Sequence, residues 1–288
     1  MRRGRLTDLE RIRLAEAREQ DPELDLGLPE GADRWSVWGQ GELGPEPYPG
    51  WLVVEEGATD TRLGVVKTGK EADVHLLERA VPGGRSCYLA EKRYRASDHR
   101  LFHRDAGYLE GRRVKESRLE RAIEKRTAFG MKVIGEQWAL AEFAALGRLW
   151  QGGVPVPYPV QRLGTDLLIE FLAEEDGAAA PRLAQLRPGA SQLCDLWEQL
   201  RAALDGMARL GFTHGDLSPY NILVHQGRLV LIDVPQIVDV VVNPRGRELL
   251  LRDVANVGSW FAARGLPDAG REQEQLGDWL LAEIGLHS

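Results

Sequence analysis

Short apolar runs separated by turn residues begin at position 51, and they predict the strands of a small sheet. The runs contain mainly Val, Leu and Tyr, and they cover 51–54, 63–66, 73–77 and 87–92. Pro82-Gly83-Gly84 supplies a turn between the last two of them. We therefore expect an antiparallel sheet in the part of the chain that follows residue 50.

Helical spacing replaces this pattern further along the chain. Apolar residues at 138, 141, 145 and 149 fall on one face of a helix, which predicts a helix over about 135–150 that ends at Gly152-Gly153. Residues 160–171 return to strand character, and 192–210 predict a second amphipathic helix that is closed by Gly211. The chain thus passes from strands to a helix, back to strand and then to a second helix.

The first 50 residues have a different character. Thr7-Asp8-Leu9-Glu10 is a capping-box pattern that opens a short charged helix, and this helix fades by Asp21. Residues 27–50 are rich in Gly, Pro and Trp, which indicates an irregular linker or a segment that wraps over the following domain.

Composition limits the class of protein. The 288 residues carry a net charge of −7, so the chain as a whole is not a polycation suited to nucleic acid. The two cysteines, Cys87 and Cys194, are too few for a disulfide framework, and we expect both to be reduced core residues. No apolar run is long enough for a signal peptide or a membrane span. We therefore expect a cytoplasmic enzyme that does not contact membranes.

The densest chemical signal is the run 213–224, which reads Thr-His-Gly-Asp-Leu-Ser-Pro-Tyr-Asn-Ile-Leu-Val. Asp216 is followed five positions later by Asn221, and a predicted hairpin with a Gln-Gly turn then leads to Asp233. This hairpin would bring Asn221 and Asp233 to the same end, beside Asp216. Kinase-like enzymes gather such groups around the γ-phosphate of ATP, one carboxylate to orient a hydroxyl and two ligands for Mg²⁺. The alternative, with His214 in a turn and Asp216 as a cap, leaves the register of the second Asp unexplained.

A glycine-containing turn between two predicted strands is a second candidate for phosphate binding. The sequence Gly-x-x-x-x-Gly-Lys that ends at Lys70 satisfies most of the P-loop pattern, but Glu71 stands where Ser or Thr should hold Mg²⁺, and a strand follows instead of a helix. We interpret the turn as a loop that covers phosphates, with Gly69 allowing close approach and Lys67 or Lys70 supplying charge. A plain hairpin turn is the alternative, and Lys92 on the next strand favours phosphate binding.

Together these features resemble the RIO family of atypical protein kinases between about residues 63 and 261. The resemblance rests on several motifs that occur in the right order. They are Thr68-Gly69-Lys70-Glu71-Ala72-Asp73-Val74, Ala90-Glu91-Lys92-Arg93-Tyr94, Trp138-Ala139-Leu140-Ala141-Glu142-Phe143, Gly153-Val154-Pro155-Val156-Pro157, the run 214–221, Ile232-Asp233-Val234-Pro235-Gln236 and Arg252-Asp253-Val254-Ala255-Asn256-Val257.

The resemblance implies an α+β, two-lobed fold like that of protein kinases, with ATP and Mg²⁺ as ligands. It implies that Lys92 contacts the α- and β-phosphates and pairs with Glu142, and that Glu170 to Leu172 form the hinge that reads adenine. It also implies that the phosphate-covering loop touches the nucleotide through Thr68, Gly69, Lys70 and Glu71. The chain would then divide into an N-terminal extension over 1–50, an N-lobe over 51–171 and a C-lobe over 172–288.

In the C-lobe, the resemblance makes Asp216 the catalytic carboxylate and Asn221 and Asp233 the Mg²⁺ ligands. Asp233 would also be able to accept a phosphoryl group. The chain ends 55 positions after Asp233 without an Ala-Pro-Glu sequence, which leaves no room for an activation segment or for the helices that grip peptide substrates. ATP turnover coupled to ribosomal-subunit maturation is therefore as plausible as phosphorylation of a protein on Ser or Thr.

Two positions depart from the resembled family: Gly215, where many members have Ala, and Pro219, where many have an acidic residue. The variant His-Gly-Asp-Leu-Ser-Pro leans toward aminoglycoside- and choline-kinase-like phosphotransferases, which act on small-molecule hydroxyls. A third alternative is a nucleotide-binding scaffold that docks on a pre-ribosomal particle and turns over little. The loop at 69–71 and the segment 253–256 favour the RIO family, and the complete set of catalytic residues disfavours a scaffold.

Charge is concentrated between Glu91 and Lys132, where 13 Lys or Arg stand against 7 Asp or Glu. One interpretation is a segment that meets ribosomal RNA, a pre-ribosomal particle or the ATP site. The other is a solvated charged helix over 112–126 in which Glu and basic residues pair at helical spacing, and the pattern slightly favours it. The histidines are scattered without metal-ligand spacing, so Mg²⁺ is the only metal that we expect.

Overall fold

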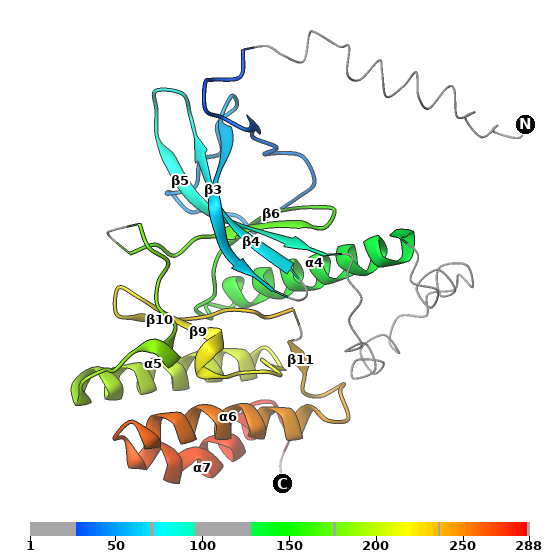
Figure 1. Cartoon of the computed structure of the whole chain (residues 1–288). Helices are drawn as coiled ribbons and strands as arrows, with labels where there is room; N and C mark the ends of the chain where they lie inside the picture. The colour runs from blue at the N-terminus through cyan, green and yellow to red at the C-terminus, as the bar shows by residue number, and fades with distance from the viewer. Residues whose placement is uncertain (1–26, 70–71, 96–127, 175–176, 236, 287–288) are drawn as a thin grey trace, which may run out of the picture.

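An antiparallel sheet forms the upper part of the molecule in Figure 1. The computed structural model describes residues 27–69, 72–95, 128–174, 177–235 and 237–286. The strands lie in the order β1-β3-β4-β5-β7-β6-β2. Their bounds are Arg34–Trp35 (β1), Glu42–Leu43 (β2), Thr59–Thr68 (β3), Ala72–Ala80 (β4), Ser86–Tyr94 (β5), Pro159–Leu163 (β6) and Asp166–Glu170 (β7).

Most of the predicted strands are confirmed. The runs 63–66, 73–77 and 87–92 fall in β3, β4 and β5, and residues 82–84 form the turn between the last two. The stretch 160–171 is two strands rather than one, because Gly164 adopts a left-handed φ of 60° and reverses the chain. The run 51–54 is not a strand. Leu52 and Val53 are buried against the outer face of the sheet, Trp51 is exposed, and Arg85 holds the segment through the carbonyls of Gly50 and Leu52.

The segment before β3 lies across the outer face of this sheet, the face that points away from the helices. Its short strands extend both edges of the sheet, because β1 pairs with β3 and β2 pairs with β6. Leu52 and Val53 pack against Leu77 and Leu89 in one buried cluster, with Trp38 and Tyr48 at its margin. The described part of the predicted 1–50 extension is therefore tied into the sheet rather than joined to it by a loose linker.

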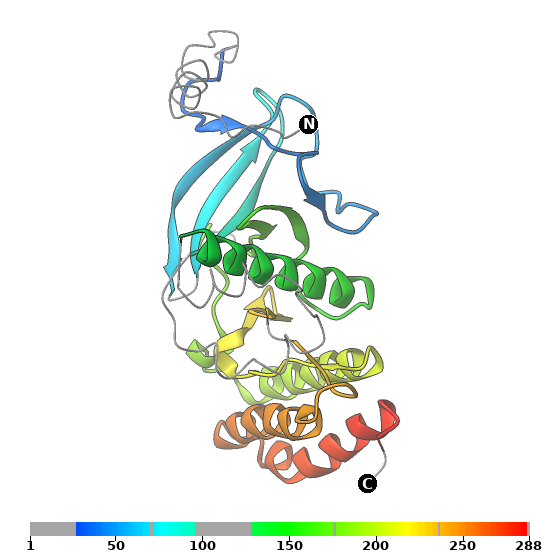
Figure 2. The ribbon, with the colours of Figure 1, turned by 90° about the vertical axis from the view of Figure 1, so that its right-hand side faces the viewer.

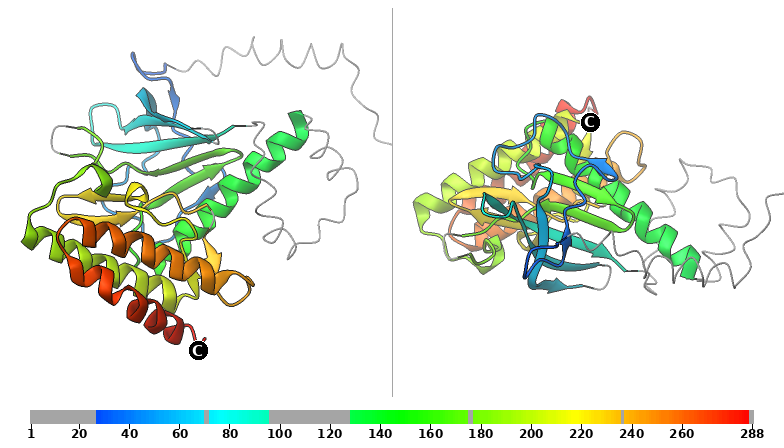
Figure 3. Two further views of the ribbon diagram at one scale, coloured as in Figure 1. Left: turned by 60° about the horizontal axis from the view of Figure 1, so that its bottom comes forward. Right: turned by 90° about the horizontal axis from the view of Figure 1, so that it is seen from above.

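The helix α4, Ala128–Gln151, crosses the inner face of the sheet, and it begins before the predicted start at about 135. Figure 2 shows α4 between the sheet above it and the helices of the lower lobe. That lobe contains α5 (Ala190–Arg209), α6 (Gly246–Ala263) and α7 (Pro267–Glu283), which lie side by side in the left view of Figure 3. The predicted helix over 192–210 is α5, and the predicted two-lobed α+β fold is confirmed.

Two small ribbons sit on top of these helices and carry the loops of the lower lobe. One is the predicted hairpin, β9 (Ile222–His225) with β10 (Arg228–Leu231). The other pairs β8 (Phe212–Thr213) with β11 (Val238–Asp239). Two 3-10 turns, η2 (Leu183–Gln185) and η3 (Pro219–Asn221), complete this layer.

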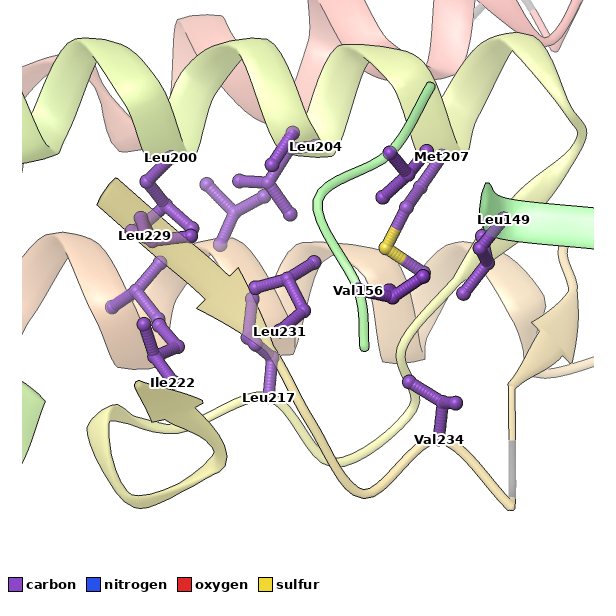
Figure 4. Packing of buried hydrophobic residues seen from close by; sticks show 14 of the residues in the cluster. Leu149, Val156, Leu200, Leu204, Met207, Leu217, Ile222, Leu229, Leu231 and Val234 are labelled. Atoms are coloured by element: carbon purple, nitrogen blue, oxygen red, sulfur yellow. The ribbon is translucent and has the colours of Figure 1, made fainter. Parts of the chain in front are cut away.

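One apolar core joins α4, α5 and the β9–β10 hairpin, as Figure 4 shows. Leu217 and Val234 are fully buried in this core, and each directly follows an aspartate of the predicted site, Asp216 and Asp233. Because interiors are close-packed, these two anchors fix the backbone from which both carboxylates project.

Two further predictions concern the cysteines and the possibility of a membrane span. Cys87 is buried, but Cys194 is exposed on the first turn of α5, so the expectation of two core cysteines is wrong for Cys194. The helical stripe of α5 is formed by its leucines, and residue 194 falls outside that stripe. None of the helices in the described ranges is long and apolar enough to span a bilayer.

Candidate active site

The β9–β10 hairpin brings the three predicted catalytic-loop positions together. The Ile232 N–H donates to the Asn221 carbonyl at 2.9 Å, so the strand that leads to Asp233 is fastened to the residue that begins the hairpin. The Asn221 side-chain amide donates to the Asp216 carbonyl at 2.9 Å. The predicted convergence of these residues is therefore present in the fold, and its cause is the register of the hairpin.

Asp233 has an unusual backbone conformation. Its φ is 63°, in the left-handed region that non-glycine residues seldom adopt. Burial of Val234 and the hydrogen bond of Ile232 hold the chain on both sides, which allows the strained residue to persist. The strain turns the Asp233 carboxylate toward the upper lobe, where it meets Lys92.

Lys92 is the centre of an ionic cluster between the lobes. Its ammonium lies 2.8 Å from Glu142 Oε1 on α4 and 3.2 Å from Asp233 Oδ1. The Tyr94 hydroxyl donates to the other oxygen of Glu142, and the Lys92 ammonium lies 5.2 Å from the centre of the Tyr94 ring. Glu142 is only 2% exposed, so its two oxygens are both occupied inside the protein.

The charges of this cluster shift its pKa values. Burial by itself lowers the pKa of Lys92, but the attraction of Glu142, Tyr94 and Asp233 outweighs it and holds that pKa well above its usual value. For Asp233, partial desolvation raises the pKa and Lys92 lowers it, helped by Lys67 and His214, so that its pKa lies below the usual value. Lys92 is thus a fixed cation, and Asp233 is a carboxylate that is ionised at neutral pH.

Asp253, on α6, positions the catalytic loop from below. Its buried carboxylate accepts hydrogen bonds from the Thr213 hydroxyl at 2.9 Å, the Gly215 N–H at 2.6 Å and the Leu217 N–H at 2.9 Å. These donors flank Asp216 on both sides. Burial raises the pKa of Asp253, and the surrounding donors act against that rise. Sequence reasoning assigned no role to Asp253, since only the motif 252–257 marked it.

The predicted hinge, 170–172, joins the end of β7 to the lower lobe. The Glu170 side chain turns back to accept the Tyr158 N–H at 3.0 Å, and burial raises the pKa of its carboxyl. Glu170 pairs with Leu89 in the sheet, whereas Lys92 pairs with Leu167, so the Glu170 side chain lies on the opposite face from Lys92. The Glu170 side chain is therefore turned away from Lys92, and what this residue can offer to a ligand beside Lys92 is its main chain.

Comparison with known proteins agrees with this geometry. A family model described as the RIO domain matches residues 88–274. The chain is 36% identical over 217 residues to the RIO-type serine/threonine-protein kinase Rio1 of Haloferax volcanii, covering 75% of this chain and 68% of that protein. The chain belongs to the RIO family of serine/threonine-protein kinases.

Eukaryotic relatives match over a smaller share of their own length. Serine/threonine-protein kinase RIO1 of Chaetomium thermophilum is 32% identical over 212 residues, which cover 70% of this chain and 40% of that protein. Serine/threonine-protein kinase RIO3 of Bos taurus is 27% identical over 232 residues, which cover 78% of this chain and 43% of that protein. This RIO chain thus spans less than half of those two relatives.

The predicted phosphate-covering loop of this RIO protein is described only in part. Thr68 ends β3, and the Gly69 N–H donates to the Ala72 carbonyl at 2.9 Å. A Cβ at Gly69 would lie 2.9 Å from that same carbonyl oxygen, so the tight return of the chain requires glycine. The predicted contributions of Lys70 and Glu71 fall outside the described residues and stay predictions.

The apolar face of the cleft comes from the sheet. Val74 pairs with Lys92, and Ala90 pairs with Ile169, so these residues share the face that looks toward the lower lobe. Val74 and Ile169 are half-buried, which leaves apolar surface beside the hinge. Apolar surface next to main-chain groups is typical of sites for small molecules.

The donor set of Asn221 and Asp233 fits Mg²⁺. Asn221 uses its NH₂ on Asp216 and Asp233 uses Oδ1 on Lys92, and among the described residues no hydrogen bond occupies the Asn221 side-chain oxygen or Asp233 Oδ2. Within the described ranges, no group of three or more His, Cys, Asp or Glu side chains is placed to hold a metal. Mg²⁺ is held in proteins by one or two side-chain ligands, with water and substrate phosphates completing its shell, so two oxygens suffice.

Proposed function

We propose that this chain is an ATP-dependent RIO-type kinase and ATPase that transfers the γ-phosphoryl group of Mg-ATP to a Ser or Thr hydroxyl or to its own Asp233. The observation that carries the proposal is the convergence of Lys92, Glu142 and Asp233 beside the loop that holds Asp216. Phosphoryl transfer depends mainly on positioning and on compensation of charge, and this cluster provides both.

Each residue then has a defined task. Lys92, oriented by Glu142, binds the α- and β-phosphates, and the backbone of 170–172 reads the adenine edge. Asn221 and Asp233 would hold Mg²⁺, which would compensate the charge of the phosphates. Asp216 accepts the proton of the acceptor hydroxyl as its oxygen attacks the γ-phosphorus, and ADP leaves. The Asp253 hydrogen bonds keep the Asp216 backbone in place during these steps.

Asp233 is also suited to be an acceptor, because its side chain is 43% exposed and ionised. In that case a carboxylate oxygen forms a bond to the γ-phosphorus while the bond to the β-phosphate oxygen breaks, and ADP is released. Water then hydrolyses the acyl phosphate, which returns the carboxylate and inorganic phosphate. The net reaction is ATP hydrolysis.

The test is to incubate the protein with γ-labelled ATP and to separate free phosphate, labelled protein and labelled small molecules. We expect hydroxylamine-sensitive label on the protein that disappears in Asp233→Ala, together with phosphate release without added acceptor. Acid-stable, hydroxylamine-resistant label would reject the acyl phosphate and leave transfer to Ser or Thr.

The second candidate function is a small-molecule phosphotransferase related to aminoglycoside and choline kinases. It is favoured by the His-Gly-Asp-Leu-Ser-Pro run, in which Gly215 adopts a φ of 83° that few other residues tolerate. Rapid transfer of label to an aminoglycoside or choline-like alcohol would establish it. A protein that binds ATP without releasing or transferring phosphate would instead support the nucleotide-binding scaffold.

A role in ribosome maturation is the finer part of the proposal. It rests on the basic stretch 91–132, most of which lies outside the described residues. In this role the anionic partner would be ribosomal RNA or a pre-ribosomal particle, and ATP turnover would accompany its release or remodelling.

A further inference from the structure

Two arginines from different elements hold the two ends of the catalytic loop. Arg252, on α6, donates to the Gly215 carbonyl, immediately before Asp216. Arg182, which precedes η2, donates to the Tyr220 carbonyl, immediately before Asn221. The proposed catalytic carboxylate therefore lies on a short stretch of backbone with a guanidinium group at each end.

Neither of these arginines is neutralised by a carboxylate. Among the residues that the structure describes, no Asp or Glu oxygen lies within 4.0 Å of Arg182 or Arg252. Most of the other described arginines differ in this respect, since each of them lies within that distance of a carboxylate. Examples are Arg62, Arg79 and Arg93 on the sheet and Arg201, Arg209 and Arg245 on the helices.

Two acidic residues of α6 lie near Arg252 in the sequence, and both carboxylates are bound elsewhere. Asp253 accepts from Thr213, Gly215 and Leu217, and Glu248 is bound by Arg245 at 2.7 and 3.0 Å. Arg252 helps to lower the pKa of Glu248 from a distance, but it forms no ion pair with a described carboxylate. A guanidinium has five N–H donors in a planar fork, and a single bond to a carbonyl leaves most of them free for a ligand.

The positive surface continues from Arg182 along η2. The Gln185 N–H donates to the Arg182 carbonyl, and the next residue, Leu186, offers its own carbonyl to two more arginines. Arg187 donates to it at 3.0 Å and Arg264 at 2.9 Å, and again no ion pair to a described carboxylate is present. We call the set Arg182, Arg187, Arg252 and Arg264 the arginine surface. Tyr220, 64% exposed, lies at its junction with the catalytic loop.

We propose that the arginine surface selects the phosphoryl acceptor, and that this acceptor is a protein segment whose Ser or Thr is flanked by anionic side chains, either carboxylates or phosphates. This inference rests on the proposed kinase function and names its substrate class. Guanidinium groups recognise both kinds of anion by charge-assisted hydrogen bonds. A protein segment fits better than a nucleic acid because Arg182 and Arg252 flank Asp216 itself, where residues on both sides of an acceptor hydroxyl must pass.

The decisive experiment measures binding without turnover. Dye-labelled Ser peptides of one length, with flanking Ala, Asp, phosphoserine or Lys, are titrated into the full chain in the presence of Mg²⁺ and a non-hydrolysable ATP analogue. We expect the Asp and phosphoserine peptides to bind about tenfold more tightly than the Ala peptide. An exposed ion pair gives about two- to fivefold for each guanidinium. Equal affinity for the Ala, Asp and Lys peptides would overturn the proposal.

Variants separate recognition from support of the loop. In the double variant Arg182→Met/Arg252→Met, the neutral and acidic peptides should bind with nearly equal affinity. In Arg182→Lys/Arg252→Lys, most of the preference for the acidic peptide should remain. If the substitutions only loosen the loop, the affinity for both peptides should fall by the same factor and their ratio should stay unchanged. That result would overturn the proposal. Arg228→Ala and Arg247→Ala remove exposed arginines that lie outside the arginine surface, and they should leave the ratio as in the parent chain.

Two further results of the peptide experiment would separate this proposal from a nucleic-acid site and from the proposed kinase function. If a single-stranded oligonucleotide displaces the acidic peptide at lower concentration than the unlabelled peptide does, the surface serves a nucleic acid and the proposal is wrong. If the acidic peptide binds as expected but is not phosphorylated when ATP replaces the analogue, the arginine surface stands as a docking site. In that case it is the proposed transfer to Ser or Thr that fails.

Discussion

Lys92 and Asp233 are 141 positions apart in the sequence, yet the Lys92 ammonium lies 3.2 Å from Asp233 Oδ1. One residue comes from the middle of a strand in the upper lobe and the other from the end of a hairpin in the lower lobe. The Lys92 side chain is only 13% exposed, whereas that of Asp233 is open on one side. The contact therefore joins the two lobes at a point where both a fixed cation and an accessible carboxylate are available to a phosphate.

Replacing Lys92 by Met should abolish ATP turnover and also lower stability. The phosphates lose their cation, and Glu142 is left as a buried carboxylate that keeps only its bond to Tyr94. Removing one partner of a buried pair costs roughly 3 kcal/mol, which denaturant unfolding would detect. The double variant Lys92→Met/Glu142→Met should recover part of that stability without recovering turnover. Turnover at the parental rate in Lys92→Met would reject the site.

Asp216 and Asp233 should separate transfer from binding. Asp216→Asn should reduce phosphoryl transfer by about 10²- to 10⁴-fold while fluorescent ATP analogues still bind, because the lost group acts on the acceptor proton. Asp233→Asn should instead weaken nucleotide binding that depends on Mg²⁺. Asp278→Asn, an exposed carboxylate on α7, is the matched control. Identical effects of the first two substitutions on binding and transfer would contradict the assignment.

Asp253→Ala should disorder the catalytic loop. It leaves the N–H groups of Gly215 and Leu217 and the Thr213 hydroxyl without their acceptor, and each buried unpaired donor costs about 1–3 kcal/mol. Hydrogen exchange should therefore accelerate at the Gly215 and Leu217 amides, and turnover should fall. If exchange at those amides remained slow, Asp253 would not be what holds the loop.

Stability should fall in alkaline solution, and Tyr94 should account for part of the fall. Burial and the charge of Glu142 both raise the pKa of Tyr94, which lies well above its usual 10.0. For Lys92, burial lowers the pKa, but the attraction of Glu142 outweighs it and the pKa is again well above its usual value. Above about pH 10 the unfolded chain releases these protons while the folded chain keeps them, so the free energy of unfolding drops by about 1.4 kcal/mol per pH unit for each such proton. Tyr94→Phe removes one of them.

The comparison to make is the unfolding free energy from pH 9 to 11.5 in the parent chain and in Tyr94→Phe. The variant should show the shallower decline above pH 10. Tyr158, whose burial raises its pKa to about 12, contributes equally to both proteins and cancels in the difference. Parallel curves would mean that Tyr94 is not held protonated.

The basic stretch 91–132 makes a separate prediction about RNA. If it contacts RNA, replacing Arg112, Arg113 and Lys115 by Ala should weaken binding and flatten its dependence on salt, because fewer counterions are released from the phosphates. Filter binding at several salt concentrations measures both quantities. The same affinity and slope in the variant would leave only the solvated-helix interpretation of this segment.

Sequence reasoning reached the parts of the site that depend on spacing along one hairpin. Asp216, Asn221 and Asp233 are separated by a strand, a turn and a strand, and such a unit has few ways to fold. Tyr94 and Asp253 were missed for the opposite reason. Each acts on a residue about 40 to 50 positions away, and that relationship appears only when α4 and α6 have packed.

The segment over 27–58 was predicted least well. Its Gly, Pro and Trp content indicated irregular structure, and locally that is correct, since its strands contain two residues each. Composition does not reveal which part of the sheet this segment packs against. Gly44 approaches so closely that an added Cβ would lie 2.7 Å from the Tyr158 hydroxyl, a contact that depends on a strand more than 100 positions later.

The pairing of β2 with β6 has a consequence for how the protein is made. Glu42 pairs with Arg162, so this edge of the sheet joins chain segments 120 positions apart. Closing a loop of that length is costly in entropy, and contacts so distant along the chain slow folding. During synthesis the segment that contains Glu42 must wait until β6 has emerged. A truncation before β6 should therefore leave β2 without its partner strand, whereas β1 keeps its pairing with β3.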